Sequence, residues 1–208
     1  MKKRTKKKEQ DGQQESLEHQ SLEVSMLNKD SFSDEELESY LSKGAIRASD
    51  EITVPPKILF VGDCTIATFG NFSASTGKAK SKKTFNISAM VAAAVTNSTV
   101  LNYRACLPEG KRTILYFDTE QSKYHCHTVL ERIYRLSGLS LKKDDPRLMF
   151  WGLREYTPKL RIAVIDYALR KYEGVGLVII DGLRDLMYDI NNGKEATDVM
   201  TVLMAWTS

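Results

Sequence analysis

The run Leu177-Val178-Ile179-Ile180 most constrains the fold, because four successive aliphatic residues leave no polar side for solvent. A strand of this composition is typical of a parallel sheet that is covered on both faces. Asp181 follows the run, and the carboxyl ends of such strands form the edge at which open α/β sheets bind ligands. An aspartate after an apolar strand is also common in α/β proteins. The run therefore predicts an α/β fold, and Asp181 marks an edge of the sheet without identifying a function.

Three further apolar segments alternate with helical patterns and extend the predicted sheet. The order is strand, helix, strand, helix, strand, helix, strand, and right-handed crossovers then give a three-layer parallel sheet with helices on both faces. A last helix is expected over 195–206. The predicted strands before residue 177 are 64–69, 114–117 and 148–151, and the predicted helices are 85–95, 126–136 and 162–172.

Residues 77–84, Gly-Lys-Ala-Lys-Ser-Lys-Lys-Thr, have the length and the ends of a phosphate-binding loop. A triphosphate needs curled backbone N–H groups, a cation, and a hydroxyl for magnesium, and Lys83 and Thr84 supply the last two. A helix beginning near Lys82 would direct free N–H groups at the anion. The residues assigned to nucleotide binding are Gly77, Lys78, Ala79, Lys80, Ser81, Lys82, Lys83 and Thr84.

Lys82 stands where the pattern G-x-x-x-x-G-K-T/S has its second glycine. A lysine forced to a positive φ costs about 1–2 kcal/mol, a strain that functional sites tolerate. The alternative interpretation is a solvated, lysine-rich surface loop. The assignment of residues 77–84 as a phosphate-binding loop therefore depends on the elements that follow it.

The segment Ile114 to Ser122 joins a buried strand to a polar end that carries Asp118 and Glu120. Hydrolysis requires a carboxylate that orients and polarises the attacking water, and we predict Glu120 in that role. Asp181 is predicted to hold the magnesium with Thr84. In the alternative, Asp118, Thr119 and Ser122 are turn and helix-capping residues, and Ser122 is assigned to capping.

The loop, the segment ending in Glu120 and the strand ending in Asp181 resemble, in this order, the RecA-like branch of P-loop ATPases. That branch includes the hexameric plasmid replicative helicases of the RepA type and their DnaB-like relatives. The resemblance covers about residues 55–208 and departs most clearly at Lys82. It implies that Lys83 contacts the phosphates of ATP, that Thr84 and Asp181 bind Mg²⁺, and that Glu120 is the catalytic base. It also implies a role in DNA replication or mobilisation on mobile elements, with DNA as a partner.

Three functions remain open at this point. The first is an ATPase that couples hydrolysis to helicase-type movement on DNA or to replication initiation. The second is a nucleotide-binding regulator or initiator with poor turnover, and the third is an interaction module on a degenerate P-loop fold. The resemblance implies further strands and an arginine after 195–206, so we expect the domain to be incomplete at its C-terminus. A homo-oligomer is expected only if the full-length domain is present.

Residues 1–54 are predicted to form a tail, first basic and then acidic and polar, that is largely disordered. Its first ten residues hold six of the 30 Lys and Arg residues and one acid, so the rest of the chain is slightly acidic although the net charge is +3. Ser33, followed by three acidic residues, is able to cap a short helix to Leu41. A solvated tail is the alternative that we favour.

Composition indicates a soluble protein of the cytoplasm. No stretch approaches the roughly 18 apolar residues of a membrane span, and the basic start has no apolar run of a secretory signal behind it. Three scattered cysteines suit a reducing compartment. His125, Cys126 and His127 are consecutive, and consecutive side chains on a helix point to different faces, so no metal site is predicted there.

Overall fold

A computed structural model of the chain describes residues 32–78, 82–189 and 191–207. The chain divides into two compact units, Met1–Thr53 and Val54–Ser208. Within the described ranges, no helix is long and apolar enough to cross a membrane.

The first unit contains helix α2 (Asp34–Gly44). The hydroxyl of Ser33 accepts a hydrogen bond from the N–H of Glu36, whose carboxylate accepts one from the N–H of Ser33. This capping box satisfies two N–H groups that the first helical turn leaves free. The capping pattern at Ser33 therefore does start a helix, although the sequence analysis favoured a solvated tail, and the helix runs to Gly44 instead of Leu41. None of its residues is buried, so the helix is solvated.

The second unit is an α/β domain built on a parallel sheet in the order β6-β5-β7. Strand β5 lies in the middle, with Asp118 opposite Gly152 of β6 and opposite Asp181 of β7. The three predicted parallel strands from residue 113 onward are therefore confirmed, and their carboxyl ends meet at one edge. The strands are β5 (Thr113–Asp118), β6 (Leu148–Gly152) and β7 (Val175–Asp181).

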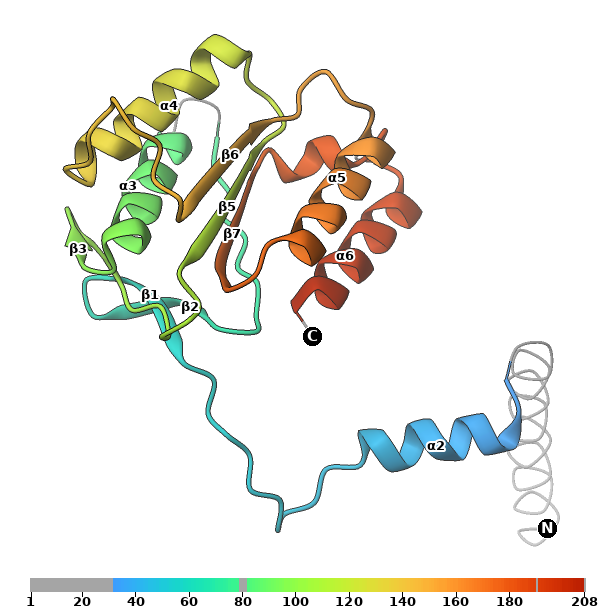
Figure 1. Ribbon diagram of the computed structural model, residues 1–208. Coiled ribbons are helices and arrows are strands. Elements are labelled where there is room, and N and C mark those ends of the chain that lie inside the picture. The colour runs from blue at the N-terminus through green and yellow to red at the C-terminus, as the bar shows by residue number, and fades with distance from the viewer. Residues whose placement is uncertain (1–31, 79–81, 190, 208) are drawn as a thin grey trace, which may run out of the picture. The chain divides into compact units, whose positions relative to one another are not determined.

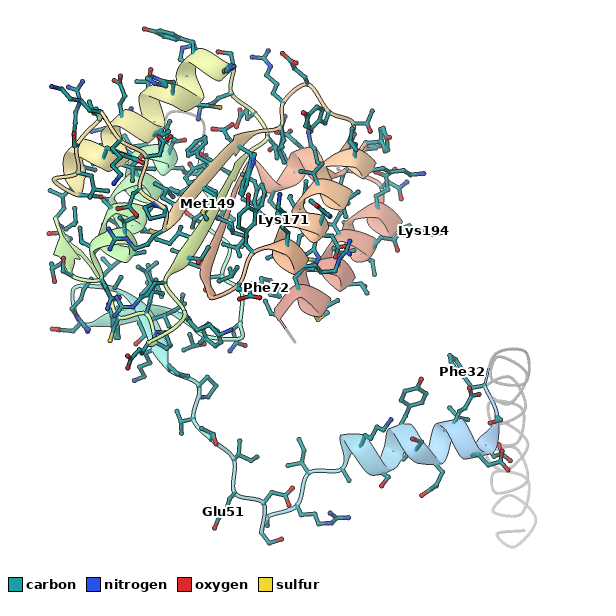
Figure 2. All side chains as sticks on the ribbon, viewed as in Figure 1. Phe32, Glu51, Phe72, Met149, Lys171 and Lys194 are labelled. Atoms are coloured by element: carbon teal, nitrogen blue, oxygen red, sulfur yellow. The ribbon has the colours of Figure 1, made fainter. Side chains whose placement is uncertain are left out.

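Helices cover both faces of this sheet (Figure 1). Ile114 and Tyr116 of β5 pack in one cluster with residues of α3 and α4. Leu115 and Phe117 pack in a second cluster with residues of α5 and α6. Side chains fill the space between the sheet and the helices (Figure 2). Because successive strand residues point to opposite faces, β5 is buried on both sides. The helices are α3 (Lys83–Thr96), α4 (Lys123–Leu136), α5 (Pro158–Lys171) and α6 (Gly193–Thr207).

The prediction that the segment 64–69 belongs to the parallel sheet is wrong. Its strand, β2 (Cys64–Thr68), pairs antiparallel with β1 (Lys57–Val61). The two residues between them, Gly62 and Asp63, form a tight turn in which Gly62 has φ +54°. A two-residue turn with a glycine at positive φ reverses the chain into a hairpin, and this Gly-Asp pair is a sequence signal that the prediction overlooked.

The second sheet has the order β2-β1-β4-β3. Its strands β3 (Thr99–Val100) and β4 (Tyr103–Ala105) form a short hairpin after α3, and β4 pairs with β1. None of β1, β3 and β4 was predicted. Strands β3 and β4 are only two and three residues long, whereas β1 contains the apolar run Ile58–Val61, which the prediction overlooked. In the described residues, the chain between β2 and α3 is irregular, so no strand of the parallel sheet leads directly into the predicted loop.

Candidate functional site

Helix α3 begins at Lys83, immediately after a residue in the left-handed conformation. Lys82 has φ +60° and ψ +25°, which is the backbone strain expected where the loop pattern requires glycine. The Nζ atom of Lys83 donates hydrogen bonds to the carbonyl oxygens of Gly77 at 2.9 Å and Lys78 at 3.3 Å. The side chain of Lys83 therefore reaches the backbone at the start of the predicted loop. Three loop residues assigned to nucleotide binding, Ala79, Lys80 and Ser81, lie outside the described residues.

The start of α3 differs from the starts of α2 and α5 and resembles that of α4, which within the described ranges also has no side-chain cap and no acidic residue in its first turn. Among the described residues no side chain caps α3, and its first turn contains no acidic residue. In α5, by contrast, the hydroxyl of Thr157 accepts a hydrogen bond from the N–H of Leu160. Thr84 is half-buried in the first turn of α3, and its hydroxyl makes no hydrogen bond to another described residue. An uncapped helix start with a positive dipole end suits an anion.

Replacing Lys82 with glycine is expected to raise the free energy of unfolding by about 0.5–1 kcal/mol. Glycine reaches positive φ without the clash of a Cβ atom, although it adds entropy to the unfolded chain. Urea denaturation would measure the change. Lys82→Ala is the matched control, because it removes the charge and keeps the Cβ atom. An equal gain in both variants would show that repulsion among the loop lysines, and not the φ angle, carries the cost.

The end of β5 is organised by Asp118, which is completely buried. Its carboxylate accepts hydrogen bonds from the N–H groups of Glu120 and Gln121, and from the side-chain amide of Gln121. Burial raises the pKa of Asp118 above its ordinary value, against the opposing effect of the backbone N–H donors. Asp118 therefore fits the predicted role of a turn residue. Ser122 is the N-cap residue of α4, although its hydroxyl lies 2.9 Å from Nδ1 of His125 and makes no capping bond.

Glu120 is exposed just beyond this buried turn. Its N–H group is held by Asp118, while its carboxylate makes no hydrogen bond or ion pair to another described residue. A Cβ atom added at Gly182 would lie 3.5 Å from the Cβ atom of Glu120. Glu120 and the end of β7 are therefore neighbours, and the Glu120 carboxylate is accessible to a water molecule.

Asp181 ends β7 and is held through its main chain and its side chain. Its carbonyl oxygen accepts a hydrogen bond from the N–H of Thr119 at 3.0 Å. Its Oδ2 atom accepts one from the hydroxyl of Tyr116 at 3.1 Å. Burial, followed by the nearby Asp181 and Asp118 carboxylates, raises the pKa of Tyr116, so the phenol is a neutral donor.

The turn after Asp181 packs tightly against Thr119. Gly182 has φ +104°, and a Cβ atom there would lie 2.2 Å from Oγ1 of Thr119. That hydroxyl is 2.8 Å from the carbonyl oxygen of Gly182 and 3.2 Å from Oδ2 of Asp185. Arg161 of α5 donates to the carbonyl oxygens of Leu153 and Asp185. These hydrogen bonds link the turns that follow the three parallel strands. The turn after β7 contains the 3₁₀ helix η1 (Leu183–Leu186).

The direction of α3 places its start at this same edge. The guanidinium of Arg147, next to the start of β6, donates to the carbonyl oxygen of Val95 near the end of α3 at 2.9 Å. The 14-residue helix is about 21 Å long, and the six residues of β5 span about 20 Å. Because α3 runs opposite to the strands, its start lies toward their carboxyl ends (Figure 1).

Asp118 and Asp181 also face the helix that follows the loop. Tyr116 lies in the cluster with α3 and α4, and Asp118 is two residues further along the strand, on the same face. Asp181 is opposite Asp118 in the parallel register. The shared edge and the shared face bring the loop and the acidic residues to one region of the domain. Within the described residues, no hydrogen bond or ion pair joins Lys83 or Thr84 to Glu120 or Asp181.

Tyr116, Arg161 and Gly182 belong to this site and were not predicted, and Thr119 was expected only as a turn or capping residue. Alternate residues of β5 point to the same face of the sheet. This alternation was the available signal for Tyr116, because it places Tyr116 on the same face as Asp118. No local pattern indicates the contact of Thr119 with Gly182 or that of Arg161 with Asp185, because each joins separate elements. A shallow hollow elsewhere, lined by residues of the β1–β2 and β3–β4 turns, contains Arg104 stacked on Phe60 and none of the predicted residues.

No protein-family model, curated protein or solved structure matches the chain. The chemistry of the site therefore rests on its own residues and their geometry.

Proposed function

We propose that residues 55–208 form a RecA-like P-loop domain that binds ATP with Mg²⁺ and hydrolyses the nucleotide. The observation that supports this most is the start of α3. Lys82 stands at positive φ, the ammonium of Lys83 bonds to the carbonyl oxygens of Gly77 and Lys78, and no described side chain caps the helix. Asn97 and Leu101 are the other described non-glycine residues at positive φ, and both lie in turns, whereas Lys82 has this conformation at the glycine position of the motif.

The side chains at the sheet edge fit a magnesium triphosphate. Lys83 supplies an ammonium group, the start of α3 supplies N–H donors, and Thr84 and Asp181 supply a hydroxyl and a carboxylate. Within the described ranges, no group of three or more His, Cys, Asp or Glu side chains is placed to hold a metal. Mg²⁺ in nucleotide sites is bound by one or two carboxylates together with the phosphates and water, so Asp181 with Thr84 is sufficient.

The proposed roles divide between binding and hydrolysis. Lys83 and the N–H groups of α3 bind and orient the phosphates, and Thr84 and Asp181 hold the ion that neutralises their charge. Glu120 accepts a hydrogen bond from a water molecule and orients it for attack on the terminal phosphorus. Asp118 keeps Glu120 at the edge by binding its N–H group.

A role in DNA replication, mobilisation or helicase-type movement rests on the order of the motifs.

A second candidate function is a nucleotide-binding regulator or initiator with slow turnover. The lysine at position 82 favours it, because a bulky residue replaces glycine where the phosphates would approach the backbone.

The proposed function is tested by titrating the protein with a non-hydrolysable ATP analogue, with and without Mg²⁺, in a calorimeter. We expect Mg²⁺-dependent binding, and at 100 times the dissociation constant a gain of about 2.7 kcal/mol in unfolding free energy. Phosphate release with and without single-stranded DNA then separates the helicase-type ATPase from the regulator. Absence of binding at millimolar nucleotide would contradict both.

A further inference from the structure

We propose that Tyr116 is a positioning residue that fixes the carboxylate of Asp181 in the orientation needed to bind Mg²⁺. This role rests on the proposed function. Tyr116 donates its hydroxyl proton to Oδ2 of Asp181 across the β5–β7 pair, at 3.1 Å. The two residues are 65 positions apart in the chain.

The ring of Tyr116 is held rigidly, so its hydroxyl is a fixed point. The side chain is completely buried. The ring stacks on that of Phe150 in β6, with centroids 4.3 Å apart and an interplanar angle of 11°. A buried tyrosine whose ring is clamped between packed elements cannot move its hydroxyl without displacing its neighbours. The hydrogen bond from the fixed Tyr116 hydroxyl therefore holds the Asp181 carboxylate in one position relative to the sheet.

Asp181 depends on β5 for this support. Strand β7 pairs only with β5 within the described sheet, so its other side offers no neighbouring strand. Thr119 holds the carbonyl oxygen of Asp181, and Tyr116 is the only described side chain that donates to its carboxylate. Oδ1 makes no hydrogen bond to another described residue. One carboxylate oxygen is therefore fixed by the protein, while the other remains for a ligand.

Hydrogen bonds to a metal-binding carboxylate fix its orientation, and their loss commonly weakens metal binding 10–100-fold. Tyr116→Phe removes one oxygen atom and keeps the ring stacked on Phe150. The Asp181 carboxylate would then rotate freely before it binds the ion. Nucleotide binding without Mg²⁺ does not use this carboxylate, so it should not change.

The experiment titrates Mg²⁺ into each protein at a fixed concentration of a fluorescent ATP analogue. For Tyr116→Phe we expect the half-saturating Mg²⁺ concentration to rise about tenfold, with the Mg²⁺-free affinity unchanged. Tyr134→Phe is the matched control. Tyr134 is also a buried tyrosine, and its hydroxyl oxygen accepts a hydrogen bond from the N–H of Asp145 in a different part of the domain. This control should leave the Mg²⁺ midpoint where it is in the wild type.

Two results would overturn the role of Tyr116 alone. One is an unchanged Mg²⁺ midpoint in a folded Tyr116→Phe protein that still binds nucleotide. The other is an equal loss of Mg²⁺-free affinity, which would indicate general disruption of the site. If the wild type shows no Mg²⁺-dependent binding, the proposed function fails as well.

If Tyr116→Phe does not fold, Phe150→Leu keeps the phenol and loosens its ring. A rise of about threefold or more in its midpoint would support the role, and an unchanged midpoint would overturn it.

Discussion

Replacing Glu120 with glutamine is expected to lower the rate of ATP hydrolysis about 10²–10⁴-fold, the range typical for loss of a positioned general base. The amide has nearly the shape of the carboxylate but cannot accept the proton of the attacking water. Because Glu120 is exposed and its side chain supports no other described contact, folding should be unaffected. Nucleotide affinity should stay within about twofold, since the carboxylate acts on the water and not on the phosphates.

The measurement is phosphate release, with and without single-stranded DNA, beside a binding titration of the same protein. Glu109→Gln is the matched control, because Glu109 is an exposed glutamate in the turn before β5, at the opposite end of that strand. Release that is unchanged in Glu120→Gln would remove Glu120 from catalysis. Tight binding with no measurable release by the wild type would instead favour the nucleotide-binding regulator.

Replacing Lys83 with alanine is expected to weaken ATP binding about 10–150-fold. This corresponds to the loss of about 1.5–3 kcal/mol, the range for a hydrogen bond to a charged group. The ammonium now bonds to the carbonyl oxygens of Gly77 and Lys78, on the loop that would surround the phosphates. Its removal takes away both the charge for the phosphates and the hydrogen bonds to the carbonyl oxygens of Gly77 and Lys78.

Calorimetric titration with the ATP analogue would measure this loss, with Lys142→Ala as the control for a change of charge. Lys142 is an exposed lysine in the turn after α4, remote from the loop in sequence. Thermal unfolding of both variants separates a local effect from a folding defect. Undiminished binding by a folded Lys83→Ala protein would contradict the assignment of residues 77–84 as a nucleotide-binding loop.

The strained lysine was predictable because the loop motif assigns a definite backbone conformation to one position. The pattern around Lys83 and Thr84 requires glycine at residue 82, and Lys82 has the positive φ that this requirement implies. The helix over 34–44 was equally local, since Ser33 and Glu36 satisfy each other's N–H groups within one turn.

The hairpin before the loop shows where such reasoning fails. Residues 64–68 have the composition of a strand, and they form one, but composition does not say which strand will pair with it. The Gly62-Asp63 turn directs β2 back onto β1 and away from the parallel sheet. The sequence analysis identified this segment correctly as a strand. It placed the strand in the parallel sheet because of the expected order of motifs, and that placement was wrong.

The sequence by itself determined the three apolar strands from residue 113 onward, the helices between them and the position of Asp181 at a strand end. These features depend on the spacing of apolar residues and on caps, which act over a few residues. Only the tertiary structure decided that Tyr116 meets Asp181, that Thr119 packs on Gly182, and that α3 starts at the carboxyl edge. Each of these contacts joins segments that are distant in the chain, and the packing of the sheet against its helices selects them together.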